Sequence, residues 1–198
     1  MPALRLGACI LAAGSSRRFG GDKRLAQLSA DTTVLAATLQ LISSSFDETL
    51  VVVREHEADL AHELQRQFRI RAICAKDSAL GMGHSIAAAS QHFDGWDGVA
   101  LCLGDMPFVK SETLAQLSRS FTNQFASKPI VAPLYNNQSG HPVLFHRAYF
   151  AEMEKLAGDN GAKSIVQNAR EHVIRIAVDD PGVLADIDQP DDLPKPDA

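Results

Sequence analysis

Residues 6–23 read LGACILAAGSSRRFGGDK, an apolar run that leads directly into a loop of small and basic residues. The run Leu6–Leu11 has the length and composition of a buried strand. In the loop, Gly14 and its small neighbours let a ligand approach the main chain closely, and consecutive free amides can bind an anion. Arg17 offers phosphate a planar, two-pronged donor, and Lys23 offers a mobile positive charge. The stretch therefore predicts a phosphate-binding loop, with a solvated basic surface loop as the alternative.

The rest of the chain alternates short apolar runs with helical patterns. Further strands are expected at Thr49–Val53, Ile70–Cys74, Val99–Leu103 and Ile130–Ala132, and weaker ones at Pro142–Phe145 and Val173–Val178. Helices are expected to open at Thr32–Leu35 and to cover Glu57–Phe68, Ser85–Phe93 and Ser111–Phe121, the last capped by Ser111. Strands and helices in this order form βαβ units. We therefore predict a three-layer α/β/α Rossmann-like fold with a mostly parallel central sheet.

Composition and charge exclude several function classes. A chain of 198 residues is expected to form one domain over residues 1–198, and its net charge of −5 argues against a broad nucleic-acid partner. The apolar run before Gly14 is too short to span a bilayer, so no membrane partner is expected. The three cysteines, Cys9, Cys74 and Cys102, lie far apart without zinc-ligand spacing. We expect them to be small buried apolar residues of a cytoplasmic protein.

Two groups of aspartates are candidate metal ligands. Asp105 follows the apolar run Val99–Leu103, and a carboxylate at the carboxyl end of a buried strand can hold a hard cation over bound phosphates. A turn cap is the alternative for this residue. Near the C-terminus, Asp186 and Asp188 alternate along an extended segment, which places them on the same side. For this acidic run the alternative is a solvated surface.

Glycines also precede the helix expected at Ser85–Phe93. Gly81 and Gly83 permit the close approach of a base or ribose, and the start of a helix favours an anion. Ser85 is the expected cap of this helix. Farther along, His141 stands before a proline at the entrance of a predicted strand. It is either a catalytic base or a residue that orients the substrate or the loop.

Taken together, these segments resemble the nucleotidyltransferases of molybdenum-cofactor synthesis, the MobA-like NTP transferases, which include molybdopterin cytidylyltransferase and molybdopterin-guanine dinucleotide synthase. The segments follow the family order and are LAAGSSRRFGGDK at 11–23, GMGHS at 81–85, GDMP at 104–107, GHPVLF at 140–145, GDNGAK at 158–163 and DIDQPDDL at 186–193. Three residues depart from the family pattern. Phe19 replaces a methionine, Lys163 an arginine and Gln189 a threonine. Lysine lacks the two-pronged donor of arginine, so the contact made by Lys163 differs from that of the family.

The resemblance implies a nucleotidyltransferase fold whose residues 1–110 bind the nucleotide, while residues 111–198 bind the acceptor and carry the second metal carboxylate. It implies Mg²⁺ on Asp105 and Asp188, and catalytic roles for Arg17, Lys23 and Asp105. The nucleotide-binding residues it implies are Leu11, Ala12, Ala13, Gly14, Ser15, Arg17, Lys23, Gly81, Gly83 and Ser85. The acceptor-binding residues are His141 and Asp159.

The implied reaction joins a nucleoside monophosphate, taken from a nucleoside triphosphate, to a phosphorylated acceptor and releases pyrophosphate. Such chemistry needs positioning and compensation of charge more than covalent help from the protein. The form LAAG, together with GHP and the D-x-D ending, favours CTP as donor over GTP, and the resemblance implies molybdopterin as acceptor. A molybdoenzyme or its chaperone is the implied recipient of the product. The alternatives are a sugar, polyol or other small-metabolite phosphate as acceptor, or a non-catalytic accessory protein that carries the cofactor.

Overall fold

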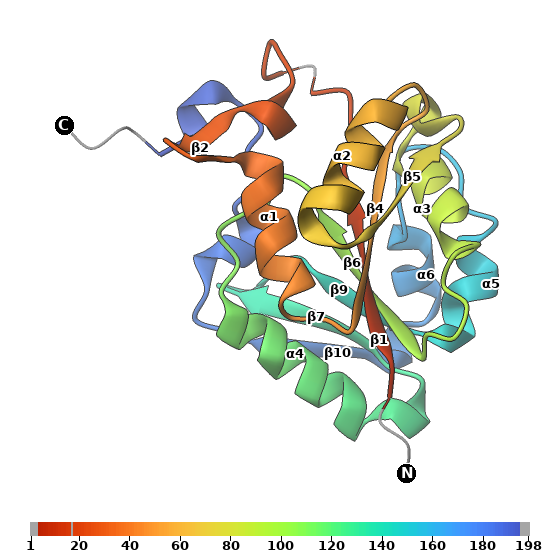
Figure 1. Ribbon diagram of the computed structural model, residues 1–198. Coiled ribbons are helices and arrows are strands. Elements are labelled where there is room, and N and C mark those ends of the chain that lie inside the picture. The colour runs from red at the N-terminus through yellow and green to blue at the C-terminus, as the bar shows by residue number, and fades with distance from the viewer. Residues whose placement is uncertain (1–3, 17, 195–198) are drawn as a thin grey trace.

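The central element of the molecule is a mixed, mostly parallel sheet. The protein is described here by a computed structural model that covers residues 4–16 and 18–194 (Figure 1). The strand order is β10-β7-β9-β6-β1-β4-β5, and the short β8 pairs with β7. The strands are β1 Leu6–Leu11, β4 Glu48–Arg54, β5 Arg71–Ala75, β6 Gly98–Leu103, β7 Ile130–Tyr135, β8 Gln138–Ser139, β9 Val143–His146 and β10 Val173–Ala177.

Strand directions follow the prediction except at the short strands. β1 runs parallel to β4 and β6, β4 to β5, and β7 to β10. β9 runs antiparallel to both β6 and β7, and β8 is antiparallel to β7. A separate hairpin joins β2 (Gln27–Ser29) and β3 (Thr32–Thr33). The predicted α/β fold with a mostly parallel sheet is therefore confirmed.

Helices cover both faces of the sheet, which explains why β1, β4 and β6 are apolar almost throughout. The longer helices are α1 Val34–Ser43, α2 Ala58–Phe68, α3 Met82–Ser90 and α4 Ser111–Asn123, with α5 Phe150–Met153 and α6 Lys163–Asn168 as short ones. One core cluster joins the sheet to α1, α2 and α4, and a second joins its other face to α3, α5 and α6 (Figure 1). Along β1, Ala8 and Ile10 belong to the first cluster and Cys9 to the second, as alternation in a strand requires.

Single 3₁₀ turns connect many of these elements. They are η1 Lys23–Leu25, η2 Ser78–Leu80, η3 Phe125–Ser127, η4 Arg147–Tyr149, η5 Arg170–His172, η6 Pro181–Leu184 and η7 Pro190–Asp192. No helix among the described residues is long and apolar enough to cross a membrane.

Three local expectations were wrong. Ser85 does not cap α3, because the helix begins at Met82 and Ser85 lies buried in its first turn. Ser111 does not cap α4 either; the buried Asp180 carboxylate instead accepts the Lys110 amide at 2.9 Å and the Thr113 hydroxyl at 2.7 Å. Cys74 is exposed because β5 is an edge strand, whereas Cys9 and Cys102 are buried as expected.

Candidate active site

The carboxyl ends of β1 and β6 open into a cavity of about 540 Å³. Its walls come from the loop after β1, from η2 and the start of α3, from the end of β6, and from the segment between η6 and η7. Carboxyl ends of neighbouring parallel strands are where open α/β sheets bind ligands. The predicted nucleotide residues that line this cavity are Leu11, Ala13, Gly14, Ser15, Lys23, Gly81 and Ser85.

Two predicted nucleotide-binding residues, Ala12 and Gly83, stand apart from that wall. Arg17 lies outside the described residues. Ala12 is buried beneath the loop, and its carbonyl accepts a hydrogen bond from Arg24 at 2.7 Å. Gly83 lies buried in the first turn of α3 and packs against the main chain of Ala157. The neighbouring Arg18 does line the cavity, and its guanidinium lies 3.1 Å from a carboxylate oxygen of Asp188.

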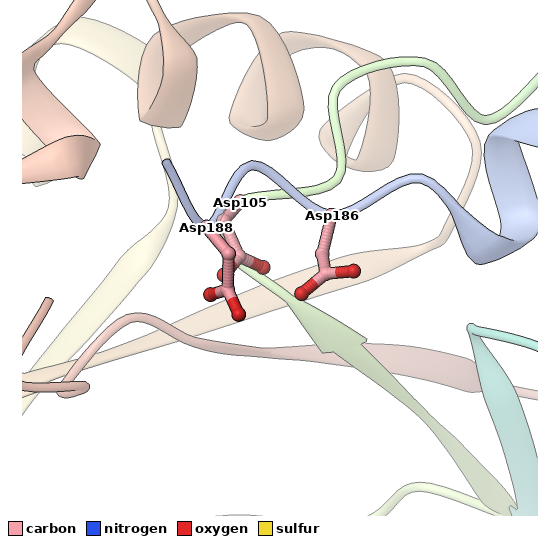
Figure 2. A group of neighbouring side chains, drawn as sticks. All are labelled: Asp105, Asp186 and Asp188. Carbon is pink, nitrogen blue, oxygen red and sulfur yellow. The ribbon is translucent and has the colours of Figure 1, made fainter. Parts of the chain in front are cut away.

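Asp105, Asp186 and Asp188 form a cluster of carboxylates at one wall of this cavity (Figure 2). One oxygen from each lies within 4.8 Å of the others. Asp105 follows β6, and the Ile187 amide donates to the Asp105 carbonyl at 3.0 Å, which fastens the C-terminal segment to the β6 loop. Ile187 is fully buried, so extended alternation turns the aspartates on either side of it toward the cavity.

The cluster fits a hard divalent cation. Its donors are carboxylate oxygens, the ligand type that Mg²⁺ and similar ions prefer. The Oδ1 atom of Asp105 is buried, and no described residue forms a hydrogen bond with it. A bound cation would give this buried acceptor a partner.

Lys23 compensates part of the negative charge. Its Nζ lies 2.6 Å from Oδ2 of Asp105 and 2.7 Å from Oδ1 of Asp188. Burial lowers the pKa of Lys23, but the hydrogen bonds to these two aspartates outweigh burial and leave the pKa raised. The hydrogen bond from Lys23 likewise lowers the pKa of Asp188. Burial, together with the charges of Asp105 and Asp188, raises the pKa of Asp186 above that of an ordinary aspartate.

Gly81 and Gly83 serve a packing role that the sequence did not reveal. A Cβ on Gly81, whose φ is +125°, would lie 2.4 Å from the Gly158 carbonyl, and one on Gly83 would lie 2.7 Å from the Ala157 carbonyl. The Gly83 amide donates to the Gly158 carbonyl at 2.8 Å. The close approach that these glycines allow is thus to the main chain of residues 157–159. Only Gly81 also faces the cavity.

A second cavity of about 440 Å³ adjoins the first and shares Leu11, Met82, Leu103 and Asp159 with it. Both predicted acceptor residues, His141 and Asp159, line it. Burial lowers the pKa of His141, so its imidazole is neutral near neutral pH, and its Nδ1 is buried without a partner among the described residues. Lys163 also lines this cavity.

Sequence reasoning missed a polar cluster behind the loop, formed by Asp22, Arg24, Arg54 and Glu57. Arg24 is 3% exposed, although it follows Lys23 and resembles the end of a solvated basic run. The one available signal was the spacing of Arg54 and Glu57 where a strand passes into a helix, and that spacing is too common to be specific.

Comparison with known proteins gives matches over nearly the whole chain. A family model described as "MobA-like NTP transferase domain" matches residues 8–173. The purine catabolism protein PucB of Bacillus subtilis is 27% identical over 193 residues, which cover 92% of this chain and 91% of PucB.

Solved structures agree with that match. Rv0371c of Mycobacterium tuberculosis is 31% identical with a TM-score of 0.80, covering 97% of this chain and 96% of Rv0371c. A structure of Rv0371c in complex with manganese is 29% identical, with a TM-score of 0.74 and 95% of each chain covered. Molybdopterin-guanine dinucleotide biosynthesis protein A from Archaeoglobus fulgidus is 22% identical with a TM-score of 0.68 over 94% of each chain, a likeness of fold alone.

Proposed function

The chain belongs to the MobA-like NTP transferase family, and we propose that it transfers the cytidylyl group of CTP to molybdopterin with release of pyrophosphate. The observation that carries this proposal is the pair of adjoining cavities, with the carboxylate cluster and Lys23 at the wall of the first. Two ligands bound in adjoining cavities can react directly, because their reacting atoms are held together in a fixed orientation. Both cavities take residues from both halves of the chain, so we propose residues 1–198 as one catalytic unit.

The first cavity suits the triphosphate. The main-chain amides of the loop after β1 and the ammonium of Lys23 are donors to phosphate oxygens, and Arg17 adds a further cation in the same loop. In this proposal Lys23 and Arg17 stabilise the negative charge that develops on the leaving pyrophosphate. Ser85, at the amino-terminal turn of α3, and Gly81 form the part of the wall assigned to the nucleoside.

Asp105 and Asp188 would hold the divalent cation, with Asp186 beside them, and we propose Mg²⁺ as that ion. When bound, such an ion compensates phosphate charge and aligns the reacting groups. The protein's own contribution is to hold these carboxylates close together and to balance part of their negative charge. The Lys23 ammonium pairs with both carboxylates, and the Ile187 amide fastens the segment that carries Asp188 to the main chain of Asp105.

The second cavity favours a flat heterocycle over a sugar. Eight of its lining residues are apolar and large: Leu11, Met82, Ile86, Leu101, Leu103, Val143, Phe145 and Val166. Hydroxyl groups of a sugar phosphate that face these apolar walls would have no partners there, which costs about 1–3 kcal/mol for each group. A pterin ring can stack on the apolar walls, while Lys163 offers a positive charge to its phosphate. The neutral His141 can orient the acceptor, and no general base is required because a phosphate monoester is already anionic.

The test is pyrophosphate release with each of the four triphosphates, in the presence of molybdopterin or of sugar phosphates. CTP with molybdopterin should give the fastest release. Preference for another triphosphate would contradict the cytidylyl assignment, and transfer to sugar phosphates would contradict the acceptor.

A pair of variants separates catalysis from an accessory role. Asp105→Ala should lower the rate of release by about 10³-fold, because it removes a ligand of the ion. Asp97→Ala is the matched control, since Asp97 lies at the opposite end of β6 and pairs with Arg147 at 3.0 Å. If Asp105→Ala retains full activity, the carboxylate cluster is not the catalytic centre.

A further inference from the structure

The loop after β1 is held from behind by two arginines and two carboxylates, Asp22, Arg24, Arg54 and Glu57, which we call the loop clamp. We infer that the loop clamp is a positioning device that turns the loop's main-chain amides toward the phosphates in the first cavity. This inference rests on the proposed function, because it assumes that the loop binds phosphate.

Arg24 is the buried centre of the loop clamp. Its Nε and Nη2 donate to the two carboxylate oxygens of Asp22 at 2.8 and 2.5 Å. Its Nη2 and Nη1 donate to the two oxygens of Glu57 at 2.5 and 2.8 Å. Its Nη1 also donates to the Ala12 carbonyl at 2.7 Å. These are five bonds for the five N–H groups of a guanidinium, so Arg24 holds the Ala12 carbonyl in one fixed direction.

Arg54 holds the next carbonyl but one. Its Nε and Nη2 donate to the Gly14 carbonyl at 3.1 and 2.5 Å. Its Nη1 lies 3.3 Å from oxygens of both Asp22 and Glu57. The Arg54 amide also donates to Glu57 at 2.9 Å, so the end of β4 is tied to the start of α2. Glu57 therefore binds both arginines that donate hydrogen bonds to the loop carbonyls.

The hydrogen bonds to the Ala12 and Gly14 carbonyls determine the direction of the amides that follow them. In a trans peptide the carbonyl of one residue and the amide of the next point in opposite directions. The peptides after Ala12 and Gly14 are trans, and neither arginine of the loop clamp lines the first cavity. The Ala13 and Ser15 amides are therefore directed away from the loop clamp. Ala13 and Ser15 themselves line the cavity, and in the described part of the chain their amides donate to no protein acceptor.

The loop clamp also directs two neighbouring cationic side chains, those of Lys23 and Arg24, to opposite sides of the loop. Asp22 caps η1 through the Arg24 amide at 3.2 Å, and Arg24 turns into the protein. Lys23, one residue earlier, faces the cavity and its carboxylates. Two arginines and two carboxylates carry no net charge, so the loop clamp contributes to phosphate binding through orientation rather than through its field.

Binding of inorganic pyrophosphate, measured calorimetrically at saturating Mn²⁺, tests the inference. Glu57→Gln removes a negative charge near an anion site, so simple electrostatics predicts tighter binding. The inference predicts the opposite, about tenfold weaker binding, the equivalent of one misplaced charge-assisted hydrogen bond. Arg54→Met should weaken binding to a similar extent and is a second variant should Glu57→Gln fold poorly.

Arg71→Met is the matched control, because Arg71 also donates to a main-chain carbonyl, that of His92 at 2.7 Å, and pairs with Glu48 at 3.7 Å. It lies at the start of β5, away from the cavity, and should leave pyrophosphate affinity unchanged. Affinity for Mn²⁺ alone should be unchanged in all three variants. An equal loss of Mn²⁺ and pyrophosphate affinity would show general disruption and overturn the positioning role.

Failure of the inference and failure of the proposed function give different results. If the wild-type protein binds pyrophosphate and Glu57→Gln binds it equally or more tightly, the positioning role is overturned. If the wild-type protein does not bind pyrophosphate, the phosphate site itself is wrong, and the inference falls with it.

Discussion

Replacing Lys23 with methionine should increase the affinity of the nucleotide-free protein for a divalent cation. The Lys23 ammonium forms ion pairs with Asp105 and Asp188 at 2.6 and 2.7 Å, and these two residues are the proposed metal ligands. A cation that binds them must first break or weaken both ion pairs. Methionine keeps the apolar stem of the side chain and removes the competing charge.

The magnitude follows from the exposure of the two partners. A hydrogen bond to a charged group contributes about 1.5–3 kcal/mol, and the Asp105 side chain is 17% exposed, so the lower value applies to that pair. The Asp188 side chain is 38% exposed, and solvent screening reduces its contribution to roughly 0.5 kcal/mol. Removing both ion pairs should strengthen metal binding by about 2 kcal/mol, or roughly 30-fold in affinity.

The assay is titration with Mn²⁺, followed by electron paramagnetic resonance, on wild-type protein, Lys23→Met and Lys110→Met. Lys110 is the control because its ammonium donates to the Asp179 carbonyl at 2.9 Å, outside the carboxylate cluster. Lys23→Met should bind Mn²⁺ more tightly and yet lose transferase activity, because the pyrophosphate loses a cation. Equal or weaker Mn²⁺ binding by Lys23→Met would refute the competition between the ammonium and the metal.

Three further predictions concern the carboxylates. Asp105→Ala should lower the rate of transfer by about 10³-fold at unchanged thermal stability, and a loss below tenfold would contradict its role. Asp186→Asn should raise the Tm of the metal-free protein at pH 7 on calorimetry, by roughly 1 °C because solvent screens the exposed Asp186. Because the pKa of Asp186 is raised in the folded protein, the stability of the wild type falls as the pH rises through that pKa. The increase in Tm caused by Asp186→Asn should therefore vanish near pH 3, where the aspartate is protonated. A Tm at pH 7 below that of the wild type would contradict the prediction. For Glu57 burial raises the pKa, but the bonds from Arg24 and Arg54 outweigh it and lower the pKa, so its stabilisation is present at neutral pH and is lost as pH falls below about 4. Urea unfolding of Glu57→Gln should therefore show a shallower loss of stability between pH 5 and 3 than wild type, and an unchanged slope would count against the loop clamp.

The sheet could be predicted where burial on both faces made the sequence apolar, as in β1, β4 and β6. The direction of β9 could not, because a four-residue apolar run has the same pattern in either orientation. The cap of α4 was missed for a related reason. Its acceptor, Asp180, lies 70 residues beyond Lys110 and is brought there only by the tertiary fold.

The site was predictable to the extent that local sequence determines it. Asp105 was found from its place after a strand, and Asp186 and Asp188 from their alternation. Their meeting depends on the hydrogen bond from the Ile187 amide to the Asp105 carbonyl, which neither local pattern nor the family resemblance predicts. The resemblance implied only that Asp105 and Asp188 hold the same ion. Arg24 shows the limit of local reading, because nothing in the sequence KR distinguishes the lysine that faces the cavity from the arginine that is buried.

Three carboxylates within 4.8 Å would repel one another strongly, and Lys23 offsets part of that repulsion before any ligand binds. Under the proposed function, phosphates that enter the cavity compete with the carboxylates for the same ammonium. As Lys23 turns toward the phosphates, Asp105 and Asp188 lose their counter-charge and their affinity for a divalent cation rises. Metal and nucleotide should therefore bind cooperatively, each raising the affinity for the other by the same factor. Lys23→Met has no ammonium that could move from the carboxylates to the phosphates. The variant should therefore bind the metal more tightly and also show weaker cooperativity between metal and nucleotide.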